Sequence, residues 1–204
     1  MQIPYKVLKA VSLFAPVDDV RYYLNGVLID STGTDVRLVA TNGHVLGLYR
    51  LEQEAPAAQA ILSIKDVKML LGTVKRATEK DLPFDVEIRT EEPGGPMITV
   101  KHPNGIAVTV RPIEGTFPKY SRVLPTNASG DVAQFNPEYL DLFAQADRVL
   151  GELKRPNTPF VYVHHNGAAS ALVECQHDDA FVGVIMPQAI GPVHKPSEMA
   201  AGLT

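Results

Sequence analysis

The stretch VRLVATNGHVLGLYRL, residues 36–51, consists of two apolar runs joined by Asn42-Gly43. Asn-Gly between apolar runs indicates a tight β-hairpin, because both residue types tolerate the positive φ angles that a type I′ turn requires. Another apolar run at residues 23–30 precedes the hairpin, and a short polar turn at 31–34 separates the two. Together these residues predict a three-stranded antiparallel meander.

The same order of elements recurs along the chain. A helix at residues 4–15, with apolar residues at helical spacing, precedes the meander. Residues 60–113 then read as a strand, a helix and three strands, and residues 131–186 predict the series again. Each pass is about 60 residues long, which is the size of a supersecondary unit rather than of a short solenoid repeat. The sequence therefore predicts an α+β fold of three βαβββ units, with antiparallel sheets and with the helices on one face.

The number of units has a consequence for domain organisation. One such unit leaves a half-covered sheet with open edges, so two units are expected to share a core. Residues 1–52 and 60–125 are predicted to form one complete domain, 1–126, and residues 131–190 a half-domain. Residues 191–204 have no apolar periodicity and are predicted to be a disordered tail.

The composition is that of a globular protein, with 204 residues of which 45% are hydrophobic and 21% charged. No stretch approaches the roughly 18–20 unbroken apolar residues of a membrane span, and Lys6 and Lys9 make the N-terminal region a poor secretory signal. Cys175 is the only cysteine, which excludes an internal disulfide framework and agrees with a reducing compartment. A cytoplasmic location is expected.

The net charge of −4 argues against a general affinity for nucleic acid, but the basic groups are not evenly spread. The second predicted helix gathers four cations on the face opposite its apolar stripe: Lys65, Lys68, Lys75 and Arg76. Such a cluster could face a phosphate backbone, because clustered cations release condensed counterions whatever the base sequence. The alternative is an ordinary solvated helix face.

Apolar residues also occur where turns and irregular segments are predicted. They are Gly43, His44 and Leu46 at the hairpin, Phe117, Pro118 and Val123 in an irregular stretch, and Val184, Met186 and Pro187 near the end. Apolar side chains in such positions suggest a pocket, and the alternative is the normal packing of loops on a sheet.

No motif of an active site is present: G-x-S-x-G, a Walker loop, a dinucleotide fingerprint and H-E-x-x-H are all absent. Cys175, His177, Asp178 and Asp179 are the residue types of a zinc site, but they lie where a turn joins two strands. Turns collect Asp and His for conformational reasons, so neither a metal nor a cofactor is expected. A small metal hydrolase built on this cluster is the weakest alternative.

Four separate segments resemble the beta sliding clamp of bacterial DNA polymerase III. They are Asp19-Val20-Arg21-Tyr22-Tyr23-Leu24-Asn25-Gly26, Val39-Ala40-Thr41-Asn42-Gly43-His44 with Leu46, Ile113-Glu114-Gly115 with Phe117-Pro118, Tyr120 and Arg122-Val123-Leu124-Pro125, and Val184-Ile185-Met186-Pro187. They occur in the family's order, and the likeness extends to Ile190. The first two units resemble the clamp's middle domain, and the third resembles the second half of its last domain.

The resemblance implies a fold of paired βαβββ units, a ring around duplex DNA, and a hydrophobic cleft that captures short peptide motifs of polymerases. It implies a tether without chemistry of its own. The positions that it assigns to the cleft are Leu24, Thr41, Gly43, His44, Leu46, Pro118, Arg122, Val123, Ser170, Val184, Met186 and Pro187. It assigns Arg21, Tyr22 and Tyr23 to a loop that touches DNA, and the basic stripe of the second helix to the lining of the pore.

The sequence departs from the family in several places. Val45 stands where an arginine is common, and residues 188–190 differ from the family's Met-Arg-Leu type of ending, so the peptide preference is expected to differ. The third helix carries Asp141, Asp147 and Glu152 around a lone Arg148, which predicts a poor lining for a DNA pore.

The predicted function is that of a sliding-clamp-like accessory protein of DNA replication, a processivity factor and not an enzyme. It would bind clamp-motif peptides of DNA polymerases and of other replication or repair factors, and it could encircle duplex DNA as a homo-oligomer. The alternative is a peptide-binding decoy or regulator that captures clamp partners without loading onto DNA.

Overall fold

The computed structural model describes residues 1–74, 82–90, 95–102, 104–154 and 157–188. Its strands are β1 (Gln2–Ile3), β2 (Gly26–Ser31), β3 (Val36–Thr41), β4 (Val45–Leu51), β5 (Ala58–Ser63), β6 (Phe84–Arg89), β7 (Met97–Lys101), β8 (Ala107–Val110), β9 (Val161–His164), β10 (Ala171–Cys175) and β11 (Asp178–Ile185). Its helices are α1 (Tyr5–Ser12), α2 (Ile64–Thr73) and α4 (Pro137–Leu150), with short 3₁₀ turns η1 (Tyr22–Leu24) and η2 (Tyr120–Arg122). None of these helices in the described ranges is long and apolar enough to cross a bilayer.

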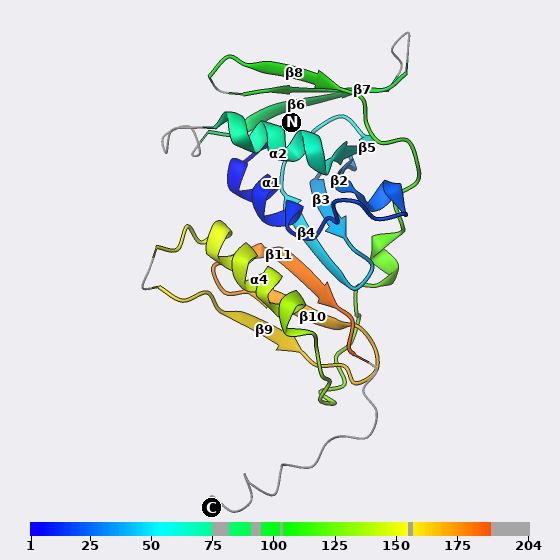
Figure 1. Ribbon diagram of the computed structural model, residues 1–204, viewed down its shortest axis with the longest axis vertical. Coiled ribbons are helices and arrows are strands. Elements are labelled where there is room, and N and C mark those ends of the chain that lie inside the picture. Colours follow the sequence, from blue (N-terminus) through cyan, green and yellow to red (C-terminus); the bar gives the residue numbers. More distant parts are fainter. Residues whose placement is uncertain (75–81, 91–94, 103, 155–156, 189–204) are drawn as a thin grey trace, which may run out of the picture.

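The strands form two antiparallel sheets. The larger has seven strands in the order β5-β2-β3-β4-β11-β10-β9, and the smaller has four in the order β1-β6-β7-β8. The three helices lie along one face of the larger sheet (Figure 1), and their apolar stripes share one core with it and with the smaller sheet. The predicted α+β class, the antiparallel sheets and the position of the helices are confirmed.

The first two units exchange the strands that precede their helices. β1 precedes α1 but pairs with β6 of the second unit, where Ile3 lies opposite Phe84. β5 precedes α2 but pairs with β2 of the first unit, where Ser63 lies opposite Gly26. Each sheet of this pair is therefore completed by the other unit, which covers an edge that would otherwise be open.

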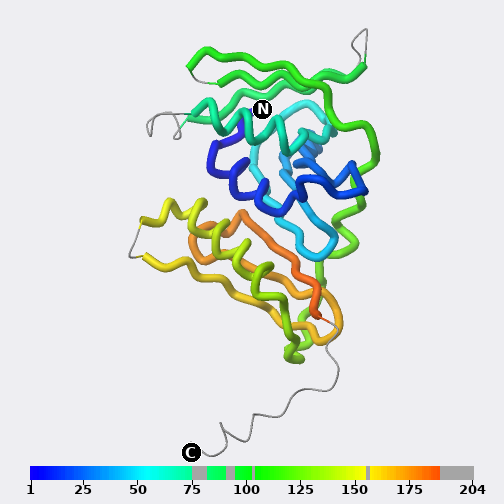
Figure 2. Tube along the Cα trace, viewed as in Figure 1, coloured from blue at the N-terminus to red at the C-terminus, as the bar shows by residue number. Residues whose placement is uncertain are grey.

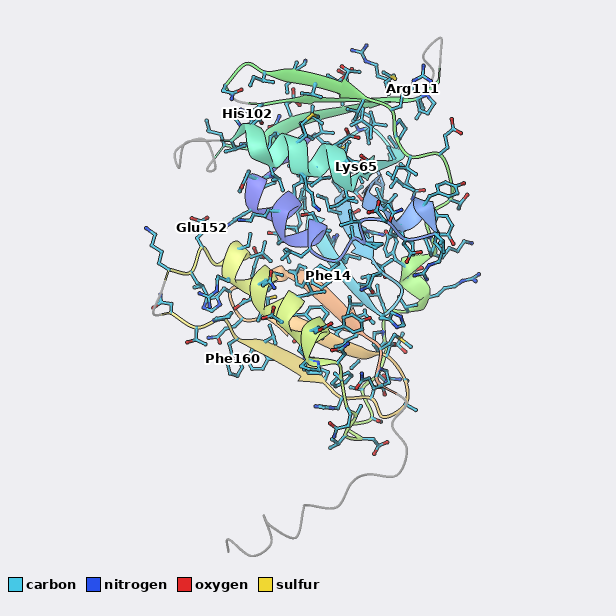
Figure 3. The ribbon with its side chains drawn as sticks, viewed as in Figure 1. Phe14, Lys65, His102, Arg111, Glu152 and Phe160 are labelled. Carbon is cyan, nitrogen blue, oxygen red and sulfur yellow. The ribbon has the colours of Figure 1, made fainter. Side chains whose placement is uncertain are left out.

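The third unit continues the sheet of the first (Figure 2), because β11 pairs with β4. Glycines lie opposite each other at this seam, Gly47 on β4 and Gly183 on β11. They leave room for the rings of Phe14 and Phe143, whose centroids are 4.9 Å apart. Figure 3 shows Phe14 between α1 and the third unit. The seam is therefore part of one continuous core.

The third unit departs from the predicted βαβββ pattern. Residues 131–135, expected as a short strand ahead of the helix, pair with no strand in the described part of the chain. The backbone carbonyl of Gln134 instead accepts a hydrogen bond from the backbone N–H of Gln188 at 2.8 Å. This carries the segment across the end of the sheet rather than along a strand.

The second and third helices begin at residues whose side chains cap the helix. Ser63 accepts a hydrogen bond from the backbone N–H of Asp66 at 3.1 Å, and Asn136 accepts one from Glu138 at 2.9 Å with Pro137 beginning the helix. The predicted type I′ turn at Asn42-Gly43 is wrong, although the hairpin is present. A type I′ turn needs a positive φ at both residues; Gly43 has φ +92°, but the φ of Asn42 is not positive. The Asn42 side chain instead accepts hydrogen bonds at Oδ1 from the backbone N–H groups of His44 and Val45.

Candidate functional site

A cavity of about 160 Å³ opens on the face of the larger sheet that is opposite the helices. It lies between η1, the β3–β4 hairpin, the segment around η2 and the end of β11. The lining residues are Arg21, Tyr23, Leu24, Thr41, Gly43, His44, Val45, Leu46, Phe117, Pro118, Lys119, Tyr120, Val123, Val184 and Met186. We call this cavity the cleft.

The floor of the cleft is apolar and lies across the seam between the first and third units. Leu46 of β4 and Val184 of β11 are directly opposite each other in the sheet, and both are buried. Leu24 and Phe117 extend this floor as members of the same apolar cluster. At the rim, Val123 and Met186 are 42% and 40% exposed. Apolar side chains that remain open to solvent around a buried apolar floor are suited to receive apolar groups of a ligand.

The two sides of the cleft are joined by specific contacts. The backbone N–H of Met186 donates to the backbone carbonyl of His44 at 2.8 Å. The His44 ring stacks on Tyr139 of α4, with the centroids 5.6 Å apart and the planes 15° from parallel. Because these contacts join the first unit to the third, the cleft depends on the docking of both.

Arg21 closes one end of the cleft without leaving an unpaired charge. Its guanidinium donates to the Asp19 carboxylate at 2.7 Å and to the backbone carbonyl of Asn42 at 2.8 Å. The hydrogen bonds from Arg21 lower the pKa of Asp19 to about 2. Gly43 has φ +92°, which favours glycine, and a Cβ atom there would lie 2.6 Å from Arg21 Nη1, so a larger residue would also have to displace the guanidinium.

The half-buried phenol of Tyr120 holds the opposite wall. Tyr120 of η2 donates its hydroxyl to Asp30 Oδ2 at 2.6 Å and accepts a hydrogen bond from Arg37 at 3.3 Å. Burial raises the pKa of Tyr120, so the hydroxyl stays a donor. Ser170 Oγ donates to the backbone carbonyl of Val123 at 3.0 Å, which ties this wall to the third unit.

Residues 3–119 match the family described as "DNA polymerase III beta subunit, central domain". The match covers more than half of the chain. The chain belongs to the DNA polymerase III beta subunit family. This membership confirms the expectation of a non-catalytic, sliding-clamp type of protein over an enzyme.

Relatives and solved structures of the beta subunit family agree with this match. The beta sliding clamp of Haemophilus influenzae is 33% identical over 153 residues, covering 74% of this chain and 39% of the relative, and that of Escherichia coli K12 is 32% identical over 124 residues, covering 60% and 31%. The chain thus spans about a third of the length of the curated relatives it matches. The crystal structure of the DNA polymerase III subunit beta from Pseudomonas aeruginosa has the same fold, with a TM-score of 0.68, 19% identity and coverage of 93% of this chain and 66% of that one.

Nine of the twelve positions that the likeness to beta subunits assigned to peptide binding line the cleft: Leu24, Thr41, Gly43, His44, Leu46, Pro118, Val123, Val184 and Met186. Arg122, Ser170 and Pro187 do not line it. Arg122 is exposed, and Pro187 follows Met186 along the chain. Ser170 donates a hydrogen bond to the backbone carbonyl of Val123.

Phe117, which the sequence named among the apolar residues that suggest a pocket, also lines the cleft. Five further lining residues were assigned to no pocket from the sequence: Arg21, Tyr23, Val45, Lys119 and Tyr120. Arg21 and Tyr23 were assigned to DNA, whereas the structure places them at the cleft. Tyr120 lies within the segment that carries the resemblance to beta subunits, so that segment was the available signal.

The predicted DNA-binding residues are spread over two regions. Tyr22 is exposed beside the cleft, and Lys65 and Lys68 are exposed on α2, where Figure 3 labels Lys65. Lys75 and Arg76 lie outside the described residues, as do Ala189, Ile190 and the tail 191–204.

The predicted acidity of α4 is partly wrong. Asp147 is fully buried and accepts hydrogen bonds from the backbone N–H groups of Phe160 and His177 and from His177 Nδ1. Glu152 lies beyond the helix and pairs with Lys6 at 3.3 Å. Only Asp141 of the three acids is on the exposed surface of the helix, which makes that surface less repulsive to an anion than the sequence suggested.

The zinc alternative finds no support in the described ranges, where no three His, Cys, Asp or Glu side chains are placed to hold a metal ion. His177 is bound to Asp147, and Asp178 accepts a hydrogen bond from the Tyr49 hydroxyl at 3.0 Å. Cys175 is buried and in contact with the carbonyl of Phe143.

Cys175 is expected to resist thiol reagents in the folded protein. Burial, together with the nearby carboxylates of Asp147 and Asp178, raises the pKa of its thiol to about 12. At pH 8 the thiolate fraction should then be roughly a thousandfold smaller than for an ordinary thiol. The rate of labelling by a chromogenic disulfide reagent, measured with and without guanidinium chloride, checks this. Equal rates in both conditions would contradict it.

Proposed function

We propose that this chain captures clamp-binding-motif peptides of DNA polymerases and of other replication or repair factors in the cleft. The observation that carries the proposal is the pairing of Leu46 with Val184, because it puts an apolar floor across the seam and beneath an open rim. The membership in the beta subunit family supports a role in holding polymerases at DNA during replication, in the cytoplasm.

The chemistry of the cleft favours an extended peptide with two or more large apolar side chains. None of the lining residues is acidic, and the only charged groups among them are Arg21 and Lys119. Arg21 is neutralised by Asp19, so apolar contact rather than charge supplies the affinity.

Encirclement of duplex DNA by an oligomer is the second part of the proposal. The exposed Lys65 and Lys68 of α2 support it, since they lie on the helix side of the sheet, away from the cleft. Peptide binding and DNA binding would then use opposite faces of one sheet.

A pair of measurements tests both parts. Fluorescence anisotropy of a labelled clamp-motif peptide should show saturable binding, and a peptide with its apolar motif residues replaced by serine should not bind. Protein assembled on nicked circular DNA should be retained, and cutting the circle should release it. Absence of saturable peptide binding would reject the proposal.

The runner-up, a decoy or regulator that never loads onto DNA, makes a different prediction for the same measurements. It expects peptide binding without retention on either circular or linear DNA. Retention that survives cutting of the circle would contradict both, because it indicates direct electrostatic binding rather than a topological link.

A further inference from the structure

The larger sheet has one completed end and one open end. At one end, β5 from the second unit covers the edge of β2. At the other end β9 has β10 as its only strand neighbour within the described residues. Figure 1 shows β9 at the outer margin of the third unit. An open edge of this kind presents unpaired backbone groups to any strand that fits it.

The hydrogen-bond pattern shows which backbone groups of β9 face outward. The carbonyl of Phe160 accepts from the backbone N–H of Gln176 at 3.1 Å, so Phe160 and, by alternation, Tyr162 and His164 are bonded toward β10. The N–H and C=O groups of Val161 and Val163 therefore face the open edge. No hydrogen bond joins them to another residue in the described part of the chain.

The first two units show how such an edge is completed. In both units, the strand directly ahead of the helix pairs with the sheet of the other unit. The last residue of this strand lies opposite the first residue of the other unit's three-stranded meander, as Ile3 does with Phe84. In the third unit the corresponding segment is 131–135. It is not a strand, and its Val132 is 78% exposed. Its hydrogen bonds go to Gln188 and to His165 and Gly167, which follow the end of β9, rather than to β9 itself.

We propose that two copies of this chain join through their third units, with residues 131–135 of each copy adding as an antiparallel strand to β9 of the other. The exchange is two-fold symmetric, so one contact is made twice. It extends each seven-stranded sheet to eight strands. Each end strand would then come from another unit: β5 at one end, and residues 131–135 of the partner copy at the other. It reproduces between two chains the exchange that β1 and β5 make within one.

The burial of side chains selects the register. Phe135, Val161 and Val163 pack against the core beneath the helices, whereas Val132, Tyr162 and His164 are exposed. Residues directly opposite each other lie on the same face of a sheet. Phe135 is therefore placed opposite Val161, and Val132 opposite His164. A slip of one residue would turn Phe135 to the exposed face.

The exchange keeps the bond of this segment to Gln188 and replaces its bonds to the residues after β9, among them the one from the Gly167 N–H to the Asp131 carbonyl at 2.8 Å. In this register the backbone groups of Ala133 and Phe135 face the partner copy, as those of Met1 and Ile3 face β6. Those of Gln134 face away, so its bond with Gln188 is kept. The bond from the Ala133 N–H to His165 Nδ1, 3.1 Å long, is exchanged for a strand bond. The new strand also runs beside the half-exposed ring pair Phe160–Tyr162.

The oligomeric state tests the proposal. Light scattering coupled to gel filtration should give the mass of two chains, falling toward one chain on dilution. Val163→Pro should give one chain at every concentration, because its N–H faces the open edge and proline cannot donate there. The matched control is Thr109→Pro on β8, the edge strand of the smaller sheet. The carbonyl of Ile106 is bonded toward β7, so by alternation Val108 and Val110 are also bonded toward β7 and the N–H of Thr109 faces outward. This control should remain a dimer, and circular dichroism should show both variants folded.

A disulfide test checks the register itself. Val132→Cys with His164→Cys should form a covalent dimer on oxidation, since opposite residues of a non-hydrogen-bonded pair are about 4.5 Å apart at Cα. Gln134→Cys with His164→Cys, displaced by two residues, should not. A monomer at all concentrations, a dimer that Val163→Pro leaves intact, or a disulfide formed within one chain would each overturn the proposal. None of these readouts depends on peptide binding in the cleft.

Discussion

Met186→Asp is expected to abolish binding of a clamp-motif peptide while leaving the fold intact. Met186 is at the rim of the cleft and 40% exposed, so the free protein keeps an aspartate there in contact with water. A bound peptide would remove that water. Taking a carboxylate out of water without a partner costs about 3 kcal/mol or more. The dissociation constant measured by anisotropy should therefore rise by more than roughly a hundredfold.

The controls separate a local charge effect from a general one. Met69→Asp makes the same chemical change at a methionine that is 44% exposed on α2, on the other side of the sheet, and it should leave peptide affinity unchanged. Met186→Leu should retain most of the affinity, because it keeps the volume and the apolar surface. Met186→Lys is a second charged variant. It is needed because Lys119 also lines the cleft, and an ion pair between Lys119 and an aspartate at position 186 would reduce the effect of Met186→Asp. A lysine finds no acidic residue in the lining, so it should bind the peptide no better than Met186→Asp does. Unchanged affinity in both charged variants would remove the cleft as the peptide site.

Local signals in the sequence were sufficient to predict the elements. The Asn42-Gly43 dipeptide marks a hairpin whichever turn type it adopts, and Ser63 and Asn136 mark helix starts because their side chains cap backbone N–H groups nearby in sequence. The turn type could not be predicted, since it depends on whether the Asn42 side chain bonds forward to His44 and Val45.

The pairing of the elements could not be predicted in the same way. The sequence predicts a strand beginning at residue 60, ahead of the second helix, but it does not predict that this strand crosses to the first unit, because the partner is set by a shared core. Asp147 shows the same limit. The period of α4 leaves it off the apolar stripe, yet Phe160 and His177, which are remote in sequence, supply the donors that allow it to be buried.

The cleft was predictable only in part for a related reason. Leu46 and Val184 are apolar residues of strands, and the sequence alone gives no sign that they are adjacent across two units. Their apolar character near a turn and near the end of the chain suggested a pocket, and only the resemblance to beta subunits assigned both to one cleft. Arg21 was assigned to DNA because the resemblance matches residues 21–23 to a loop that touches DNA, whereas its hydrogen bonds to the Asp19 carboxylate and to the Asn42 carbonyl hold its side chain at the end of the cleft.

Gly183→Ala is expected to weaken both the fold and the cleft, because the seam has no room for a side chain at this position. A Cβ atom on Gly183 would overlap the ring of Phe143, which itself packs against Phe14. Overpacking of this kind costs roughly 1–3 kcal/mol. In a chain of this length each kcal/mol lowers the melting temperature by about 2–4 °C. Displacement of β11 would also move Val184 and Met186, so peptide affinity should fall together with stability.

A double-mutant cycle shows whether the overlap is the cause. Phe143→Leu alone should destabilise the protein by leaving a cavity, but in combination with Gly183→Ala it should cost less than the sum of the two, because the smaller side chain makes room for the methyl group. Gly72→Ala is the matched control. It adds the same methyl group on α2, where nothing lies within 4 Å, and should be neutral or stabilising, since alanine favours a helix. Additive losses in the cycle would mean that Gly183 is needed for some reason other than the ring of Phe143. A coupling energy of opposite sign to the single losses would instead show that the ring of Phe143, which packs against Phe14 of the first unit at the seam, occupies the space that Gly183 leaves.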